Sequence, residues 1–315
     1  MGIAGDAFRG MVRKSIEAAR SGTQALRRVA RHFTRRASRA LASPDLSDAA
    51  VHDVRKDLKR SRTALRLLRP VLAKPIYRRE ERVLRNAAHA LNAARDARVL
   101  TQTLRSLRRN RRALRRNTDV TELLHALEAD QAELRRWLRE HPAQLARTRR
   151  TLEQLCGRAA HWRVGNHGWS VLGPAMKRIY HAGRRMLPDA TPRPTDRALH
   201  EWRKRVKYLR YSLEILAPMR TRKLARLARQ AKQLSDCLGA AHDLAILAQK
   251  ARVLVKHNRV DLAPLLTIID QQRERLSLEA LSRGEQFYRA NADDWTKQLE
   301  HYWSQWRHAP QAAAG

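Results

Sequence analysis

Two stretches of this chain align without gaps at an offset of 148 residues. The first is SDAAVHDVRKDLKRSRTALRLLRP, residues 47–70, and the second is TDRALHEWRKRVKYLRYSLEILAP, residues 195–218. They begin with Ser47 and Thr195, residue types that commonly cap helices, and each continues with an aspartate, which favours a helix N-terminus. Both stretches end in proline, which cannot continue a helix. The repeat therefore predicts two halves of one design, each containing this helix.

Within each copy, four residues are spaced by three, four and three positions, which places them in one stripe about 15 Å long. The stripe residues are His52, Arg55, Lys59 and Arg62 in the first copy, and His200, Arg203, Lys207 and Arg210 in the second. Tyr211 lies on or beside the second stripe. The opposite face of each helix is apolar and is expected to face a core. It carries Val54, Leu58, Leu65 and Leu68 in the first copy, and Trp202, Val206, Leu209 and Leu213 in the second.

A helix face that only contacts water does not require the regular spacing of cations seen in the two stripes. Like charges three or four positions apart on a helix repel each other by roughly a few tenths of a kcal/mol per pair. A bound anion that neutralises the stripe explains why the sequence accepts this cost twice. Arginine suits phosphate in particular, because its planar guanidinium can donate two hydrogen bonds to neighbouring oxygens.

Weaker repeats add further candidate ligands. Residues 93–100 (AARDARVL) match residues 240–247 (AAHDLAIL), so Asp96 and Asp243 recur in both halves. We interpret these two carboxylates as groups that order basic neighbours through salt bridges. Basic residues also recur upstream of these segments and upstream of the stripe helices. From them we predict additional ligands at Arg82, Arg85, Arg229 and Lys232, and at Arg28, Arg35, Lys177 and Arg184.

The remaining sequence predicts an all-α protein. Good helix formers dominate, glycine is sparse, apolar residues recur at intervals of three and four, and no strand-like alternation is present. Prolines are expected where helices begin or end, among them Pro70, Pro75, Pro142, Pro174, Pro218 and Pro264. We expect about ten helices in one domain over residues 8–307, with halves at about 8–160 and 161–307. The linker is expected at 187–195 and a disordered tail at 308–315.

The charge of the chain indicates the class of partner. Lys and Arg number 66 against 30 Asp and Glu, which gives a formal net charge of +36. Such a surface attracts polyanions. Seven arginines and no acid lie between residues 105 and 116, and we interpret this unrepeated run as a peripheral basic patch. We expect a cytoplasmic protein without membrane contact, because no apolar run could span a bilayer and the N-terminus lacks a secretory signal.

The residues also bear on nucleic-acid binding, catalysis and metal binding. A nucleic-acid-binding protein is the main alternative, but few aromatic residues interleave the stripes, and the tryptophans fall at apolar helical positions typical of a core. An enzyme acting on phosphate chains would need paired acids for a metal, and the stripe positions are almost all cationic. No two of the 13 histidines are three or four residues apart. We therefore predict no catalytic residues, no metal site and no cofactor.

Several motifs together resemble the CHAD family, the conserved histidine α-helical domain. They are the paired HxxRxxxKxxR helices, the strings LHEWRKRVKYLRYSLEIL and LGAAHDLAIL, and the C-terminal stretch GEQFYRANADDWTKQLEHYWSQWR. The resemblance covers roughly residues 8–307. It implies two four-helix bundles related by a pseudo-two-fold axis, with basic helix faces lining a central groove or pore that binds inorganic polyphosphate. Targeting to polyphosphate granules, scaffolding of other proteins and tuning of polyphosphate turnover stay open as roles in the cell. Two departures from the repeat, Arg66 opposite Glu214 and Thr63 opposite Tyr211, indicate that the halves need not bind equally.

Overall fold

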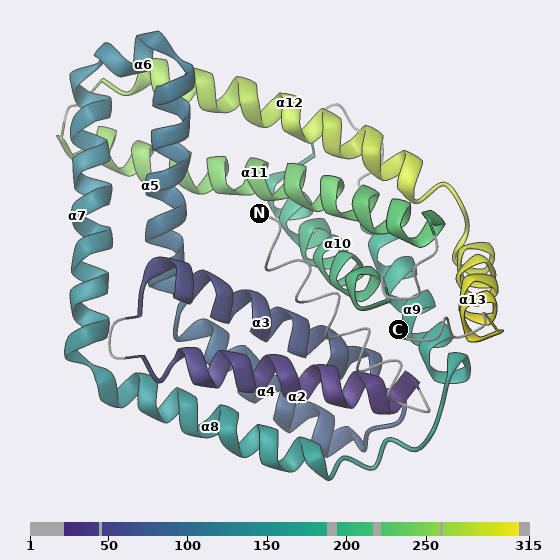
Figure 1. The fold of residues 1–315 in the computed structure, drawn as a ribbon. Coiled ribbons are helices and arrows are strands. Elements are labelled where there is room, and N and C mark those ends of the chain that lie inside the picture. Colours follow the sequence, from purple (N-terminus) through teal and green to yellow (C-terminus); the bar gives the residue numbers. More distant parts are fainter. Residues whose placement is uncertain (1–21, 44–45, 188–193, 217–221, 259–260, 309–315) are drawn as a thin grey trace, which may run out of the picture.

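The computed structural model describes residues 22–43, 46–187, 194–216, 222–258 and 261–308. In these ranges the chain is α-helical and has no strand, which confirms the all-α prediction (Figure 1). The helices are α2 (Gly22–Ala40), α3 (Asp48–Leu67), α4 (Lys74–His89), α5 (Asn92–Asn110), α6 (Arg112–Arg116), α7 (Thr118–Glu140), α8 (Pro142–Ala160), α9 (Trp169–Arg184), α10 (Asp196–Leu216), α11 (Arg222–Asn258), α12 (Ala263–Phe287) and α13 (Ala292–His308). The expected linker and tail, and Pro218, lie largely or wholly outside the described residues.

The two stripe helices lie in two adjoining bundles. In the first, α3 packs on α2 and α4, and α8 closes the group by packing on both α2 and α4. In the second, α10 packs on α9 and α11, α13 packs on α9, and α12 packs on α11. One continuous core runs through both bundles, and the apolar residues opposite each stripe belong to it. The predicted orientation of both stripe helices is therefore confirmed.

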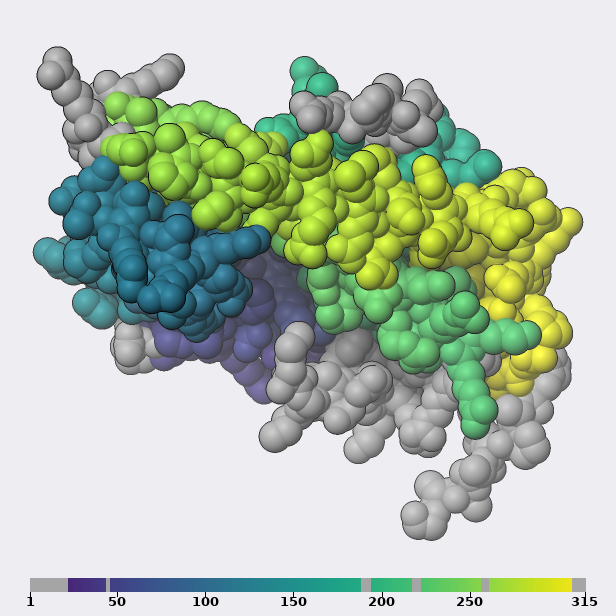
Figure 2. Space-filling model, turned by 90° about the horizontal axis from the view of Figure 1, so that it is seen from above, coloured from purple at the N-terminus to yellow at the C-terminus, as the bar shows by residue number. Residues whose placement is uncertain are grey.

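A second, smaller core joins the two halves at the other end of the molecule. It combines α5, α6 and α7 with the later turns of α11 and the start of α12. In Figure 1 these helices form the upper left corner, while α2, α3, α4 and α8 form the lower edge. Seen from above, the purple residues of the first helices lie farther back between the blue residues of α5 and α6 and the green residues of α11 (Figure 2).

The N-termini of the two stripe helices follow the expected local chemistry. The Ser47 hydroxyl accepts a hydrogen bond from the backbone N–H of Ala50 at 3.2 Å, and the Thr195 hydroxyl accepts one from Ala198 at 3.2 Å. Both predicted N-caps are thus confirmed. Pro174 differs from the prediction, because it lies inside α9 rather than at its boundary. It occupies an exposed position in the second turn of the helix, where proline removes one backbone hydrogen bond without burying a polar group.

Helix order and length follow a similar course in the two halves. In chain order, α2 and α3 of the first half correspond to α9 and α10 of the second. Helices α7 and α8 are close in length to α12 and α13. The long helix α11 stands where the first half has α4 and α5, which are separated at Ala90 and Leu91. These observations accord with an internal repeat, whose symmetry stays a prediction.

Candidate functional site

The two stripe helices cross, and two reciprocal contacts hold the crossing together. The guanidinium of Arg66 on α3 lies over the ring of Tyr208 on α10, 3.9 Å from its centroid. The carboxylate of Glu214 lies 3.8 Å from the guanidinium of Arg60. At an offset of 148, Arg60 corresponds to Tyr208 and Arg66 to Glu214. Each contact is therefore the counterpart of the other, as a two-fold relation between the halves would produce.

The crossing brings basic residues of both stripes together. Arg203 is buried, with 8% of its surface exposed, and Arg55, Lys59 and Lys207 are partly buried. The charges of Arg55 and Arg203 both lower the pKa of Lys59, and the charges of Lys59 and Arg203 lower the pKa of Lys207. Side chains that influence one another in this way lie close together in space. The stripes thus form one site between the halves rather than two separate surfaces.

Helices α5 and α11 add residues that the stripe pattern did not identify. Arg95 on α5 approaches Asp243 on α11, with Nη2 and Oδ1 3.5 Å apart, and its Nη1 donates to Asp96 at 2.8 Å. His242, at the repeat position of Arg95, lies beside His200. A signal for both residues was present, because Arg95 and His242 occupy matching positions in the repeated segments 93–100 and 240–247. We call the whole group the central cluster: Arg55, Lys59, Arg95, His200, Arg203, Lys207 and His242.

Burial among like charges lowers the pKa values of Lys59 and Lys207. Burial is the largest cause in both, and it lowers the pKa of Lys59 to about 7 and that of Lys207 to about 5. Neighbouring arginines lower both pKa values further, while Asp243 opposes them. A positive charge held in such a place costs free energy that a bound anion would return. The cluster is therefore built to accept negative charge.

The histidines of the cluster are neutral near pH 7. Burial, followed by the charges of Arg203 and His200, lowers the pKa of His242 to about 3. Burial and the charges of Lys204 and Arg203 lower the pKa of His200 as well. The two Nδ1 atoms lie 3.4 Å apart. His52, the remaining predicted histidine, is exposed on α3. Its pKa is lowered, first because part of its side chain is removed from water.

The position of Arg55 is fixed by groups at the end of α4 and the start of α5. Its Nη1 donates to the carbonyl of Ala88 at 2.6 Å and also to the side-chain oxygen of Asn92. The last carbonyls of a helix are unsatisfied and carry partial negative charge, so they suit a cation. The guanidinium is thus held in the cluster without a full negative charge beside its anchoring nitrogen.

The outer stripe residues are linked to carboxylates from neighbouring helices. Arg62 pairs with Glu81, whose second oxygen lies 4.0 Å from Arg85. In the second half, Asp236 lies 2.9 Å from Arg210 and 2.6 Å from Lys232. In each half one carboxylate therefore bridges two predicted ligands, so these pairs are less available to an anion than the central cluster. Neither Glu81 nor Asp236 was anticipated from sequence.

The family profile of the CHAD domain matches residues 15–252. The chain belongs to the CHAD family. The profile ends before residue 307, so the predicted extent of the domain, 8–307, stays a prediction. Helix α13 nevertheless contributes to the same core as the CHAD helices before it.

A solved structure shows the same fold at low sequence identity. The crystal structure of the CHAD domain from the plant Ricinus communis is 17% identical, with a TM-score of 0.59 over 86% of this chain and 92% of that one. PptA from Streptomyces chartreusis is 16% identical, with a TM-score of 0.49 over 87% of this chain and 98% of that one. No curated protein sequence matches this CHAD chain.

The other residues predicted as ligands in this CHAD protein are exposed or contact protein groups. Four of them are exposed on α2, α4 and α11, namely Arg28, Arg35, Arg82 and Arg229. Lys177 pairs with Asp293, and Arg184 donates to the carbonyl of Tyr288 at 3.1 Å. Tyr211 is buried beneath the second stripe, and Arg210 lies 5.5 Å from its ring centroid. Its position supports Arg210 instead of presenting its own hydroxyl.

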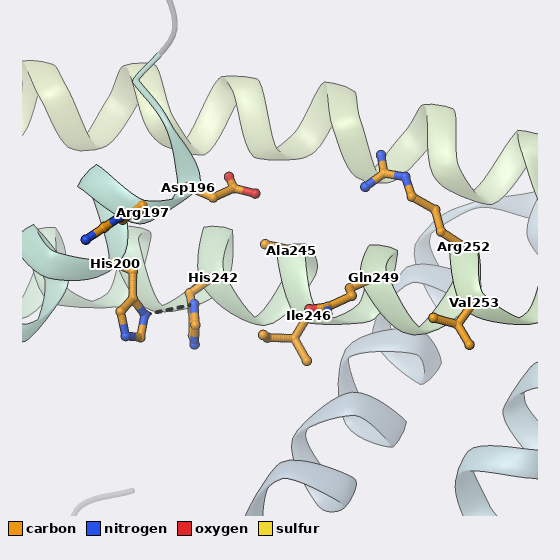
Figure 3. A pocket seen from close by; sticks show the side chains of 9 residues that line it. All are labelled: Asp196, Arg197, His200, His242, Ala245, Ile246, Gln249, Arg252 and Val253. Carbon is orange, nitrogen blue, oxygen red and sulfur yellow. Dashed lines mark hydrogen bonds between the residues drawn. The ribbon is translucent and has the colours of Figure 1, made fainter.

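A hollow of about 550 Å³ adjoins the central cluster of the CHAD domain (Figure 3). It lies between the start of α10 and the middle of α11, and it includes His200 and His242. Neither in this hollow nor in the rest of the described ranges do three His, Cys, Asp or Glu side chains gather as a metal ion would need. No helix in the described part of the chain is long and apolar enough to cross a membrane.

Proposed function

We propose that this CHAD protein binds inorganic polyphosphate in the central cluster. The convergence of Arg55, Lys59, Arg203 and Lys207 from both halves is the observation that carries the proposal. Two arginine guanidinium groups, and two lysines whose protonation a bound anion would favour, offer directed donors at short range to a chain of phosphates. Asp96 and Asp243 carry opposing charge nearby, and both approach the same residue, Arg95.

The outer pairs extend this surface on either side. Arg62 with Arg85, and Arg210 with Lys232, continue from the ends of the two stripes. After the central cluster had bound one part of a long chain, other parts of the chain could reach these cations. A phosphate that dissociated would then rebind within the same complex. Binding of long chains should therefore be much tighter than binding of short ones. A location on polyphosphate granules is the corresponding proposal for the cell.

We propose binding without catalysis. The two carboxylates nearest the cluster, Asp96 and Asp243, share Arg95 and so act as its counter-ions. Phosphoryl transfer would need a group to activate the attacking nucleophile and cations arranged around a reacting phosphate. The cluster supplies cations, and its histidines are placed among them as hydrogen-bonding groups. A general nucleic-acid binder is the alternative that the tests below address.

A charge-reversal comparison tests the location of binding. Labelled long-chain polyphosphate is titrated with wild type, with Arg203→Glu/Lys207→Glu, and with Arg112→Glu/Arg115→Glu in the exposed arginine run. The two variants change the net charge equally. We expect the first to bind at least about tenfold more weakly and the second to stay within about twofold, since contacts to buried charges are worth roughly 1.5–3 kcal/mol.

The control is folding of both variants, measured by helical circular dichroism and by the urea midpoint. If the glutamate variant does not fold, Arg203→Gln/Lys207→Gln takes its place. Equal losses in the two positions would mean that net charge alone governs binding, and the proposed site would be wrong.

A further inference from the structure

The hollow beside the central cluster differs in chemistry from the cluster itself. Its walls include the apolar side chains of Ala245, Ile246 and Val253. Ile246 and Val253 are 37% and 49% exposed, unusual values for large hydrophobic residues in the described part of this strongly basic protein. In Figure 3 both lie on the same side of α11 as the adjacent rings of His200 and His242. An inorganic phosphate chain has no apolar surface with which such a wall could make favourable contact.

The charges around the hollow are largely matched within the protein. Asp196 pairs with Arg273, and Arg252 lies 3.3 Å from Asp270. In Figure 3 the Arg252 side chain points toward α12, away from Ile246 and Val253. Arg197, the remaining charged residue of the lining, points away from Ile246 and Val253 in Figure 3. The hollow therefore carries less unbalanced positive charge than the cluster that it adjoins. It offers apolar contact, imidazole faces and a few hydrogen-bonding groups instead.

We propose that the hollow holds the nucleoside of a nucleoside triphosphate whose phosphates lie in the central cluster. This inference rests on the proposed function, because it uses the same cations for the phosphate groups. A volume of about 550 Å³ lies within the range of about 300–1,000 Å³ that is common for small-molecule sites. His200 and His242 belong to both the hollow and the cluster, so a ligand that fills one reaches the other without a gap.

The lining residues suit the two parts of a nucleoside. A planar base gains from contact with the neutral imidazoles and with Ile246, since aromatic and apolar surfaces are removed from water together. The carboxylate of Asp196 and the amide of Gln249 can bond to the hydroxyl and amino groups of the sugar and base.

The test compares ATP with inorganic tripolyphosphate, because both present three linked phosphates. Dissociation constants are measured calorimetrically for the full chain without divalent cations, with long-chain polyphosphate as a third ligand. We expect ATP to bind about tenfold more tightly than tripolyphosphate, equivalent to about 1.4 kcal/mol. In Ile246→Ser that ratio should fall toward one, while the affinity for tripolyphosphate stays within about twofold.

Leu278→Ser is the matched control, since Leu278 is an exposed leucine on α12 outside the hollow. It should keep the wild-type ratio. If tripolyphosphate and long chains bind but ATP gains nothing over tripolyphosphate, the nucleoside site is wrong and the proposed function stands. If ATP binds more tightly but Ile246→Ser leaves the ratio unchanged, the nucleoside lies elsewhere and the inference also fails. If long-chain polyphosphate does not bind, both proposals fail together.

Discussion

Lys59 and Lys207, which are 148 residues apart in the sequence, lie close together where α3 crosses α10. Burial is the main cause that lowers the pKa of Lys207 to about 5, and the charge of Lys59 is the largest electrostatic contribution. Both lysines come from the same position in the repeated sequence. The relationship means that the halves create together a site that neither stripe provides alone.

Anion binding should be accompanied by proton uptake. The pKa values of Lys59 and Lys207 are about 7 and about 5 in the free protein, and phosphate oxygens nearby would raise both. The bound state then holds more protons at pH 7.5, so affinity should increase as the pH falls from about 9 to about 6. Calorimetry in buffers of different ionisation enthalpy measures this uptake directly.

The matched variant for this measurement is Lys59→Gln/Lys207→Gln. It should bind more weakly and take up fewer protons than wild type. A long phosphate chain keeps the contribution of its own titrating ends small. Binding without proton exchange in the wild type would show that the lysines are not desolvated as described.

The stability of the unliganded protein should rise with pH above neutral. In the unfolded chain a lysine has a pKa near 10.4, whereas folding lowers the pKa of Lys59 to about 7 and that of Lys207 to about 5. Between pH 7 and pH 10 the unfolded state therefore binds more protons than the folded state. The free energy of unfolding then increases with pH across that window.

Urea denaturation at pH 7 and pH 9, in buffer free of phosphate, measures this effect. Lys207→Met should stabilise the protein at pH 7 and flatten its pH dependence, because the residue no longer has to lose a proton on folding. A wild-type stability that falls between pH 7 and pH 9 would contradict the assignment of buried lysines.

Chain length should decide how much the outer pairs contribute. Arg62→Gln/Arg210→Gln removes the outer stripe cations, which in the free protein are shared with Glu81, Glu214 and Asp236. We expect a loss of about threefold to tenfold for long-chain polyphosphate and less than twofold for tripolyphosphate, because only a long chain extends beyond the cluster. Titrations at two salt concentrations check the accompanying decrease in ionic contacts. An equal loss for both ligands would place the outer pairs inside the primary site.

Arg95 provides a test of a residue outside the stripes. Its guanidinium approaches Asp96 and Asp243, and its charge contributes to the lowered pKa values of both cluster lysines. Arg95→Gln should weaken polyphosphate binding by roughly threefold to tenfold, because it removes a cation and leaves two carboxylates near the ligand. Exposed Arg112→Gln, in the peripheral arginine run, is the control and should stay near wild type. Unchanged binding by Arg95→Gln would remove α5 from the site.

Local features of the stripe helices followed directly from sequence. The caps at Ser47 and Thr195, the buried faces and the register of Arg55 with Lys59 depend on short-range chemistry and helical periodicity. The exception was Pro174, whose expected helix boundary was wrong because α9 continues through it, at an exposed position of the second turn where the lost backbone hydrogen bond leaves no buried polar group.

The tertiary features of the site could not be derived in the same way. The crossing of α3 and α10 depends on how two cores pack, and the contacts of Arg60 with Glu214 and Arg66 with Tyr208 appear only after that packing. Glu81 reaches Arg62 from another helix, so no spacing within the stripe could reveal the pair. Periodicity supplies the face on which a side chain lies, while its partner depends on the fold.

The most direct test of the central claim is a competition titration near physiological salt. Labelled long-chain polyphosphate is bound to the protein and then displaced with unlabelled polyphosphate, duplex DNA, single-stranded RNA and short phosphates at matched charge. We predict that unlabelled long-chain polyphosphate displaces the label far more effectively than either nucleic acid, because the cluster offers closely spaced cations to a bare phosphate chain. Equal displacement by DNA or RNA would contradict a polyphosphate site and favour a general nucleic-acid-binding protein.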